Sequence, residues 1–116
     1  MNWENIKENK VDKPWGYEIH WAHTDKYVGK LLLIEAGHRL SKQYHVEKEE
    51  TVFVLQGTLL NYDEDDNVTK FYPGDTFHVK PNQVHRFGAD DMNVHLIEVS
   101  TPELNDVVRL EDDYDR

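Results

Sequence analysis

Residues 51–62, TVFVLQGTLLNY, decide the fold class of this chain. Two short runs, 51–55 and 58–62, are rich in β-branched and other apolar residues, and Gln56-Gly57 lies between them as a turn signal. Short apolar runs that are bounded by turn residues are typical of β-strands. The stretch therefore predicts two consecutive strands that are joined by a turn.

The same pattern extends from this stretch in both directions. Further strand-like runs follow one another at nearly regular spacing, at 17–21, 30–34, 69–72, 76–79, 84–88 and 93–99. The segment 63–67, DEDDN, lies between two of the runs and predicts a hairpin with an acidic tip. No convincing helical period interrupts the series. Many short, evenly spaced strands are typical of a sandwich or a closed barrel, so we predict an all-β fold.

Composition narrows the classes of function. The 116 residues are a one-domain length, and the absence of cysteine excludes disulfides and thiolate metal sites. A net charge of -10 argues against binding to duplex nucleic acid. The first ten residues, MNWENIKENK, carry charges and amides where a signal peptide would be apolar, and no stretch reaches a membrane-spanning length. We therefore expect a cytoplasmic protein with no membrane partner.

The segment GHRLSKQYHVEKEE, residues 37–50, contains the side chains that favour chemistry. Gln43, His45 and Glu47 alternate at period two, so they share one face if the segment is a strand. Glu50 follows beyond a bend, and His85 follows the turn 80–83 on a later strand. Two imidazoles and a carboxylate suit zinc, iron, manganese, nickel or cobalt. Exposed residues of an acidic protein are the alternative that the spacing leaves open.

Two segments of the chain resemble the two motifs of cupins. They are Gly37…His45…Glu50…Gly57 and Gly74…Pro81…His85 followed by Arg86. Almost the whole chain is similar to the C-terminal cupin domain of type II mannose-6-phosphate isomerases, enzymes that also contain a guanylyltransferase domain. The parts that carry this similarity are 13–17, 37–45 and 108–114. The resemblance implies one cupin domain over 1–116, a double-stranded β-helix or jelly-roll barrel, with an N-terminal arm 1–13 and an acidic tail 103–116.

The resemblance also implies a set of site residues. Four of them would ligate one divalent metal ion: Gln43, His45, Glu50 and His85. Lys30 and Arg86 would be the cations on the substrate side, with Arg86 anchoring an anion. The chain departs from the family at Asn82, where a glycine is usual, and at Glu47, where a histidine is usual. Asparagine tolerates the left-handed backbone of a turn glycine, so the first change is mild.

Glu47 is the position with the most open interpretations. Strand alternation predicts that it faces inward with Gln43 and His45, whereas a bulge would turn it out to solvent. If it faces inward, it could be an additional metal ligand or the general base of a reaction. Lys30 is the other candidate for that base.

The implied activity is that of a metal-dependent aldose–ketose isomerase acting on a sugar or sugar phosphate, with mannose 6-phosphate as the expected substrate. A non-catalytic sugar-binding cupin and an iron-dependent oxygenase are the alternatives, because one barrel fold hosts many activities. A cavity with a metal and cations would favour the sugar isomerase, and an apolar cavity would favour the oxygenase. A homodimer is also expected, with Trp3, Trp15 and Trp21 as contact residues.

Overall fold

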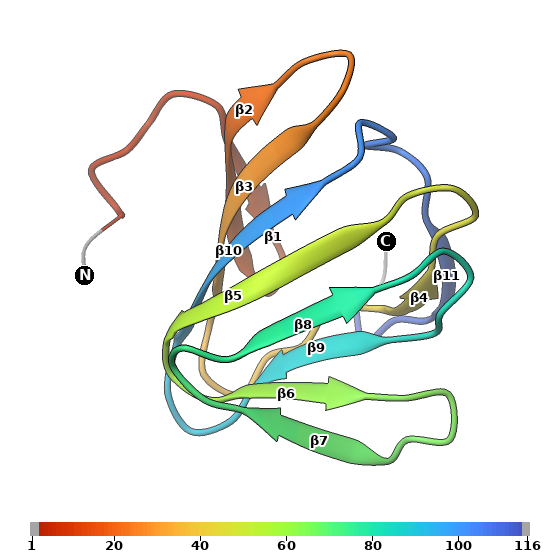
Figure 1. Ribbon diagram of the computed structural model, residues 1–116. Coiled ribbons are helices and arrows are strands. Elements are labelled where there is room, and N and C mark those ends of the chain that lie inside the picture. Colours follow the sequence, from red (N-terminus) through yellow and green to blue (C-terminus); the bar gives the residue numbers. More distant parts are fainter. Residues whose placement is uncertain (1–2, 115–116) are drawn as a thin grey trace.

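The chain folds into strands that are joined by turns and loops within residues 3–114, the part that the computed structural model describes (Figure 1). No helix occurs in that range, and hence none that is long and apolar enough to cross a membrane. The strands are β1 (Lys10–Lys13), β2 (Gly16–His23), β3 (Val28–Ile34), β4 (Lys42–Tyr44), β5 (Glu50–Gln56), β6 (Leu59–Tyr62), β7 (Val68–Phe71), β8 (Thr76–Val79), β9 (Arg86–Ala89), β10 (Val94–Ser100) and β11 (Val108–Glu111). Every run that the sequence predicts as a strand forms one, which confirms the all-β fold.

Three sheets enclose the interior of the molecule. The largest has the order β1-β2-β3-β10-β5-β8, and β7-β6-β9 and β11-β4 form two smaller ones. A bridge between Gln43 and His85 joins β4 to the segment that leads into β9. Figure 1 shows the six-stranded sheet curving round from β2 to β8, with β6, β7 and β9 on the opposite side of the barrel.

The turn at Gly57 separates two strands that do not pair with each other. β5 pairs with β10 and β8, whereas β6 pairs with β7 and β9. Gly57 has φ of 85°, and a Cβ atom there would lie 2.4 Å from the carbonyl oxygen of Asn93. Only glycine fits such a close approach at positive φ, and the turn lets the chain pass from one sheet to the other. The hairpin with the acidic tip is β6–β7, as predicted.

The inward faces of β3, β5 and β10 are apolar toward one end of the barrel and ionisable toward the other. The apolar end contains six buried residues, Leu32, Ile34, Val52, Val54, Val94 and Leu96. Lys30 and Glu50 lie two positions before Leu32 and Val52, and Glu98 lies two positions after Leu96. All three are buried on the same inward faces. Side chains of one parity share one face of a strand, so the packed core ends where a polar interior begins.

The outer face of the large sheet has a second apolar cluster. Trp3 packs there with Tyr17, Ile19 and Leu33, so the alternating apolar residues of β2 lie outside the barrel. Trp15 is buried in the main core, and of the three tryptophans only Trp21 is exposed, at 54%. Trp3 and Trp15 therefore pack within the chain instead of presenting a contact surface, and the homodimer stays a prediction.

Candidate metal centre and substrate cavity

Three buried side chains from distant parts of the sequence meet at one point inside the barrel. His45 follows β4, Glu50 begins β5, and His85 immediately precedes β9. The Nε2 atoms of both histidines lie 3.3 Å from Oε1 of Glu50. One donor atom from each residue lies within 4.8 Å of the others, a spacing that could hold a metal ion.

Hydrogen bonds fix the orientation of both imidazoles. Nδ1 of His45 donates to the carbonyl oxygen of Asp106 at 2.6 Å, and Nδ1 of His85 donates to that of Gln83 at 3.0 Å. With Nδ1 protonated, the neutral ring presents the lone pair of Nε2, and both lone pairs face Glu50. Backbone carbonyls orient metal-ligating histidines in this manner.

The same arrangement calls for a positive charge at the meeting point, either a metal ion or a proton on Nε2. Two lone pairs and a carboxylate oxygen repel one another unless a positive charge lies among them. Within residues 3–114, the buried Nε2 of His85 has no hydrogen-bond partner. Burial alone would raise the pKa of Glu50, but hydrogen bonds donated by the imidazoles of His45 and His85, when a proton occupies Nε2, and the charge of Lys48 hold that pKa well below its usual value. The donor set therefore fits a divalent ion.

Backbone contacts tie the two motifs together. The N–H and C=O groups of Gln43 and His85 bond to each other at 3.0 and 2.9 Å, and the N–H of Asn82 donates to the carbonyl of His45 at 2.6 Å. Asn82 has φ of 66°, the left-handed conformation expected for a residue in a glycine's place. The side chain of Gln43 lines the cavity, and its Oε1 accepts a hydrogen bond from Ser41 at 3.0 Å.

Glu47 does not share the inward face of Gln43 and His45, so that prediction is wrong. β4 ends at Tyr44, and Glu47 lies exposed in the bend that follows. The carboxylate of Asp106 accepts hydrogen bonds from the backbone N–H groups of residues 46, 47 and 48, at 3.0, 2.7 and 2.9 Å. This anchored bend breaks the strand alternation and turns Glu47 away from the cavity.

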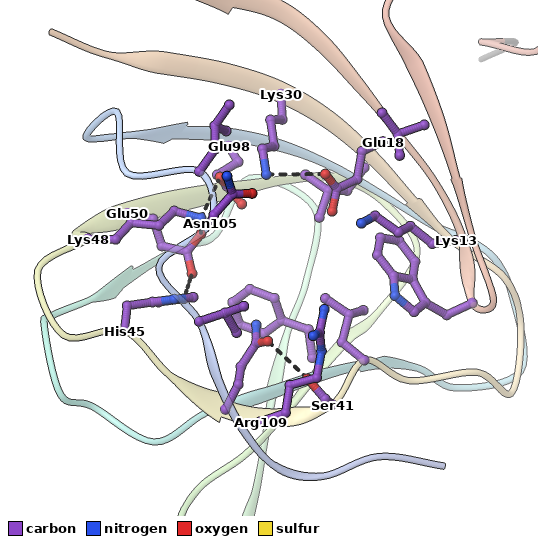
Figure 2. Close-up of a pocket in the computed structure, with 18 of the residues that line it drawn as sticks. Lys13, Glu18, Lys30, Ser41, His45, Lys48, Glu50, Glu98, Asn105 and Arg109 are labelled. Carbon is purple, nitrogen blue, oxygen red and sulfur yellow. Dashed lines mark hydrogen bonds and ion pairs between the residues drawn. The ribbon is translucent and has the colours of Figure 1, made fainter. Parts of the chain in front are cut away.

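A cavity of about 290 Å³ opens beside the three buried side chains (Figure 2). It is lined by Val11, Lys13, Trp15, Glu18, His20, Lys30, Leu32, Leu40, Ser41, Gln43, His45, Lys48, Glu50, Phe87, Glu98, Leu104, Asn105, Val107 and Arg109. Four cationic side chains are among them. The polar lining and the volume, at the small end of ligand pockets, suit a small hydrophilic molecule.

Glu98 and Lys48 connect the cavity wall to Glu50. Nζ of Lys48 lies 3.5 Å from Oε2 of Glu50 and 3.5 Å from Oε2 of Glu98. Burial, together with the negative charge of Glu50, raises the pKa of Glu98 to about 8, although Lys48 and Lys30 oppose this shift. The carboxyl of Glu98 is thus a buried ionisable group beside the candidate metal centre.

Lys30 faces the cavity as expected, but it is not a free cation. Its Nζ lies 3.2 Å from Oε1 of Glu18, which also bonds to Nε2 of His20 at 2.9 Å. Burial would raise the pKa of Glu18, yet the contact with His20 and the charges of Lys30 and Lys13 lower it to about 2. Glu18 and His20 reach the interior because the apolar face of β2 is the outer one.

Arg86 does not reach the cavity, which corrects the expectation that it faces the substrate. Its Nε donates to the carbonyl of Leu40 at 2.8 Å, and its terminal nitrogens contact Asp113 at 2.9 Å and Glu111 at 3.5 Å. Because neighbouring side chains on a strand point to opposite faces, the inward direction of His85 sends Arg86 outward. There the acidic C-terminal segment covers it.

Sequence reasoning missed five lysine, arginine and glutamate residues of the cavity wall, namely Lys13, Glu18, Lys48, Glu98 and Arg109. The sequence does indicate that Glu98 faces inward, because it alternates with Val94 and Leu96 along the same strand and so shares their face. For Lys13 and Arg109 no comparable signal exists, because each lies on a short strand whose burial depends on its partner strand.

The family comparison agrees with this geometry. The model of the family described as Cupin domain matches residues 30–100, which contain the three buried metal-type ligands. The chain belongs to the cupin family. No curated protein matches this cupin in a sequence search.

Solved structures resemble this cupin over most of its length. A conserved protein with a double-stranded β-helix domain from Klebsiella pneumoniae has a TM-score of 0.75 at 18% identity, covering 97% of this chain and 86% of that one. Ectoine synthase from P. lautus has a TM-score of 0.76 at 14% identity, covering 96% and 87%. A cupin-superfamily sugar phosphate isomerase from Silicibacter pomeroyi has a TM-score of 0.66 at 22% identity, covering 73% of this chain and 58% of that one. At these identities the likeness establishes the double-stranded β-helix fold.

Proposed function

We propose that the protein is a metal-dependent aldose–ketose isomerase acting on a sugar or sugar phosphate. The observation that carries the proposal is the buried convergence of His45, Glu50 and His85 at the wall of a small cavity lined by cations and carboxyls. The similarity of fold to a sugar phosphate isomerase supports it. The most specific form of the proposal is the interconversion of mannose 6-phosphate and fructose 6-phosphate.

His45, Glu50 and His85 are assigned as ligands of one divalent ion, with Gln43 as a fourth ligand from the adjoining strand. Imidazole and carboxylate ligands suit zinc, manganese, iron, nickel and cobalt. A bound divalent ion supplies Lewis-acid polarisation of a carbonyl and stabilises charge on its oxygen.

Isomerisation moves a proton between C2 and C1 of the sugar, so the cavity needs an acid–base group. Glu98 is assigned this role, because its carboxyl reaches the cavity beside Glu50 and its Oε2, although ion-paired with Lys48, makes no hydrogen bond in residues 3–114. Lys48, at 3.5 Å, holds the carboxyl in place. Lys30 is held by Glu18 and serves to bind hydroxyl groups of the substrate.

Deuterium exchange at C2 of the sugar tests the proposal. Protein loaded in turn with zinc, manganese, cobalt or iron is incubated in D₂O with hexose phosphates and free hexoses, and NMR measures the C2 proton. Wild type should exchange it, Glu98→Gln should exchange it at least about 100-fold more slowly, and the exposed control Glu35→Gln should match wild type. Absence of exchange with every sugar and metal would reject the isomerase and favour a non-catalytic sugar-binding cupin.

The iron-dependent oxygenase is less well supported than either sugar function. An oxygenase with an apolar substrate would use an apolar cavity, whereas four cationic side chains and three carboxyls line this one. Buried charges next to an apolar ligand would be desolvated without compensation.

A further inference from the structure

Lys13 and Arg109 are the cavity cations that no carboxylate neutralises. Lys13 lies on β1 and Arg109 on β11, and neither side chain makes a hydrogen bond or ion pair within residues 3–114. Lys13 acts on Glu18 through its charge alone, without an ion pair. The first and last strands thus each contribute one free positive charge to the same cavity.

The other two cavity cations are paired. Lys30 lies 3.2 Å from Glu18, and Lys48 lies 3.5 Å from both Glu50 and Glu98. Acidic residues outnumber basic ones by 23 to 13 in this chain, so carboxylate partners are abundant. Two unpaired cations that line one cavity of such a chain indicate a position for an anionic ligand.

The strand register explains why Arg109 lines the cavity. Arg109 is the cross-strand partner of Gln43 in the β11–β4 pair, and directly opposed residues stand on the same face of a sheet. Gln43 lines the cavity, and Arg109 lines it as well while its side chain remains exposed to solvent. Figure 2 shows Lys13 on the side of the cavity that lies across from His45, with Arg109 on the wall between them.

We propose that Lys13 and Arg109 form a phosphate-binding subsite in the cavity, with Lys13 on the side across from the metal centre and Arg109 on the wall between. Arginine offers a planar fork to two phosphate oxygens, and lysine adds a compact charge. This inference rests on the proposed function and narrows the substrate to a monosaccharide phosphate. The volume of about 290 Å³ fits one sugar ring or chain but not a sugar nucleotide.

Direct binding measurements test the subsite without reliance on catalysis. Isothermal titration of metal-loaded protein compares mannose 6-phosphate, mannose and inorganic phosphate, in wild type, Lys13→Met and Arg109→Gln. Loss of a charged hydrogen bond weakens binding roughly 10- to 100-fold. Each variant should therefore lose about that much affinity for mannose 6-phosphate and for inorganic phosphate, and keep its affinity for mannose. Lys80→Met, an exposed lysine outside the cavity, is the matched control and should bind as wild type does.

Three results would overturn the subsite. They are wild-type affinity of both variants for mannose 6-phosphate, an equal loss for mannose and mannose 6-phosphate, and no phosphate-dependent binding by the wild type. Phosphate-dependent binding that requires Lys13 and Arg109 supports the subsite even if no C2 exchange occurs, in which case only the isomerase is rejected. Exchange with unphosphorylated mannose alone would retain the isomerase and reject the subsite.

Discussion

Each imidazole of the candidate metal centre depends on one hydrogen bond to a backbone carbonyl. Asp106 accepts from His45 and Gln83 accepts from His85, which leaves both Nε2 atoms facing Glu50. A ligand set prepared in this way loses little rotational freedom when an ion binds. Removing one ligand should therefore reduce the metal affinity more than removing one of the hydrogen bonds that support it.

His85→Ala should abolish metal retention. The substitution removes one of two imidazole ligands and leaves Glu50 with a single imidazole partner. We expect the affinity for zinc or manganese to fall by more than about 100-fold, beyond the roughly 10- to 100-fold loss typical of supporting residues. Metal analysis after dialysis and titration calorimetry measure the change. His23→Ala alters an exposed histidine and should leave metal content intact; equal loss in both variants would contradict the assignment.

Glu47→Gln should leave metal affinity within about twofold of wild type. The side chain is exposed and does not line the cavity, so its charge is screened from the metal centre by water and salt. Glu50→Gln, measured beside it, should lose most of the affinity. A large loss for Glu47→Gln in titrations with manganese or zinc would show that the bend rearranges to bring Glu47 inward.

Glu18 should make stability depend on pH in the acid range. Its pKa falls from 4.5 in the unfolded chain to about 2 in the folded protein, which corresponds to about 3 kcal/mol. Because the folded pKa is the lower one, this stability is fully present above pH 4.5 and is lost as the pH falls toward 2. Urea unfolding of Glu18→Gln should show the deficit at pH 7 and a smaller one at pH 3. An exposed control, Glu64→Gln, should show no such trend.

Alternation along single strands could have placed more of the site than the motifs did. His85 inward implies Arg86 outward, and Val94 and Leu96 inward imply Glu98 inward. The motif resemblance favoured Arg86 for the substrate, and the structure shows that strand parity was the better guide. The prediction that Glu47 faces inward failed because side chains alternate only while the strand continues, and the strand ends at Tyr44.

At the scale of elements, the C-terminal segment completes the site. Asp106 anchors the bend after β4 through three backbone N–H groups and also orients His45 from 61 positions away in the sequence. β11 then pairs with β4, and Asp113 lies against Arg39 and Arg86. These contacts join residues that are distant in sequence, so local patterns could not have revealed them.

Asp106→Ala should weaken metal binding without removing any ligand. Loss of the carboxylate frees three N–H groups of the bend that leads from His45 to Glu50, so we expect an affinity loss of about tenfold. Asp106→Asn retains one acceptor oxygen and should fall between Ala and wild type. This graded order in metal titrations identifies a positioning role. Equal affinity of all three proteins would contradict it.

Considered as a whole molecule, the barrel has one packed end and one polar end. Leu, Ile and Val from the apolar runs of β3, β5 and β10 form the packed end, and their burial stabilises it. The polar end follows from strand pairing, since Lys30 stands opposite Glu98 in the β3–β10 register. Such a polar end buries ionisable groups at a cost, and a bound cation would offset part of that cost.

Thermal stability of the whole protein should therefore depend on metal concentration. An ion that binds only the folded state stabilises it by about 2.7 kcal/mol at a free concentration 100 times its Kd. For a domain of this length, that should raise the Tm by roughly 10 °C. Scanning calorimetry of chelator-treated protein with increasing zinc or manganese measures the rise. His85→Ala should unfold at the same temperature at every metal concentration, because its ligand set is incomplete. A wild-type Tm that does not respond to any of the expected metals would show that His45, Glu50 and His85 pair through protons instead of a metal ion.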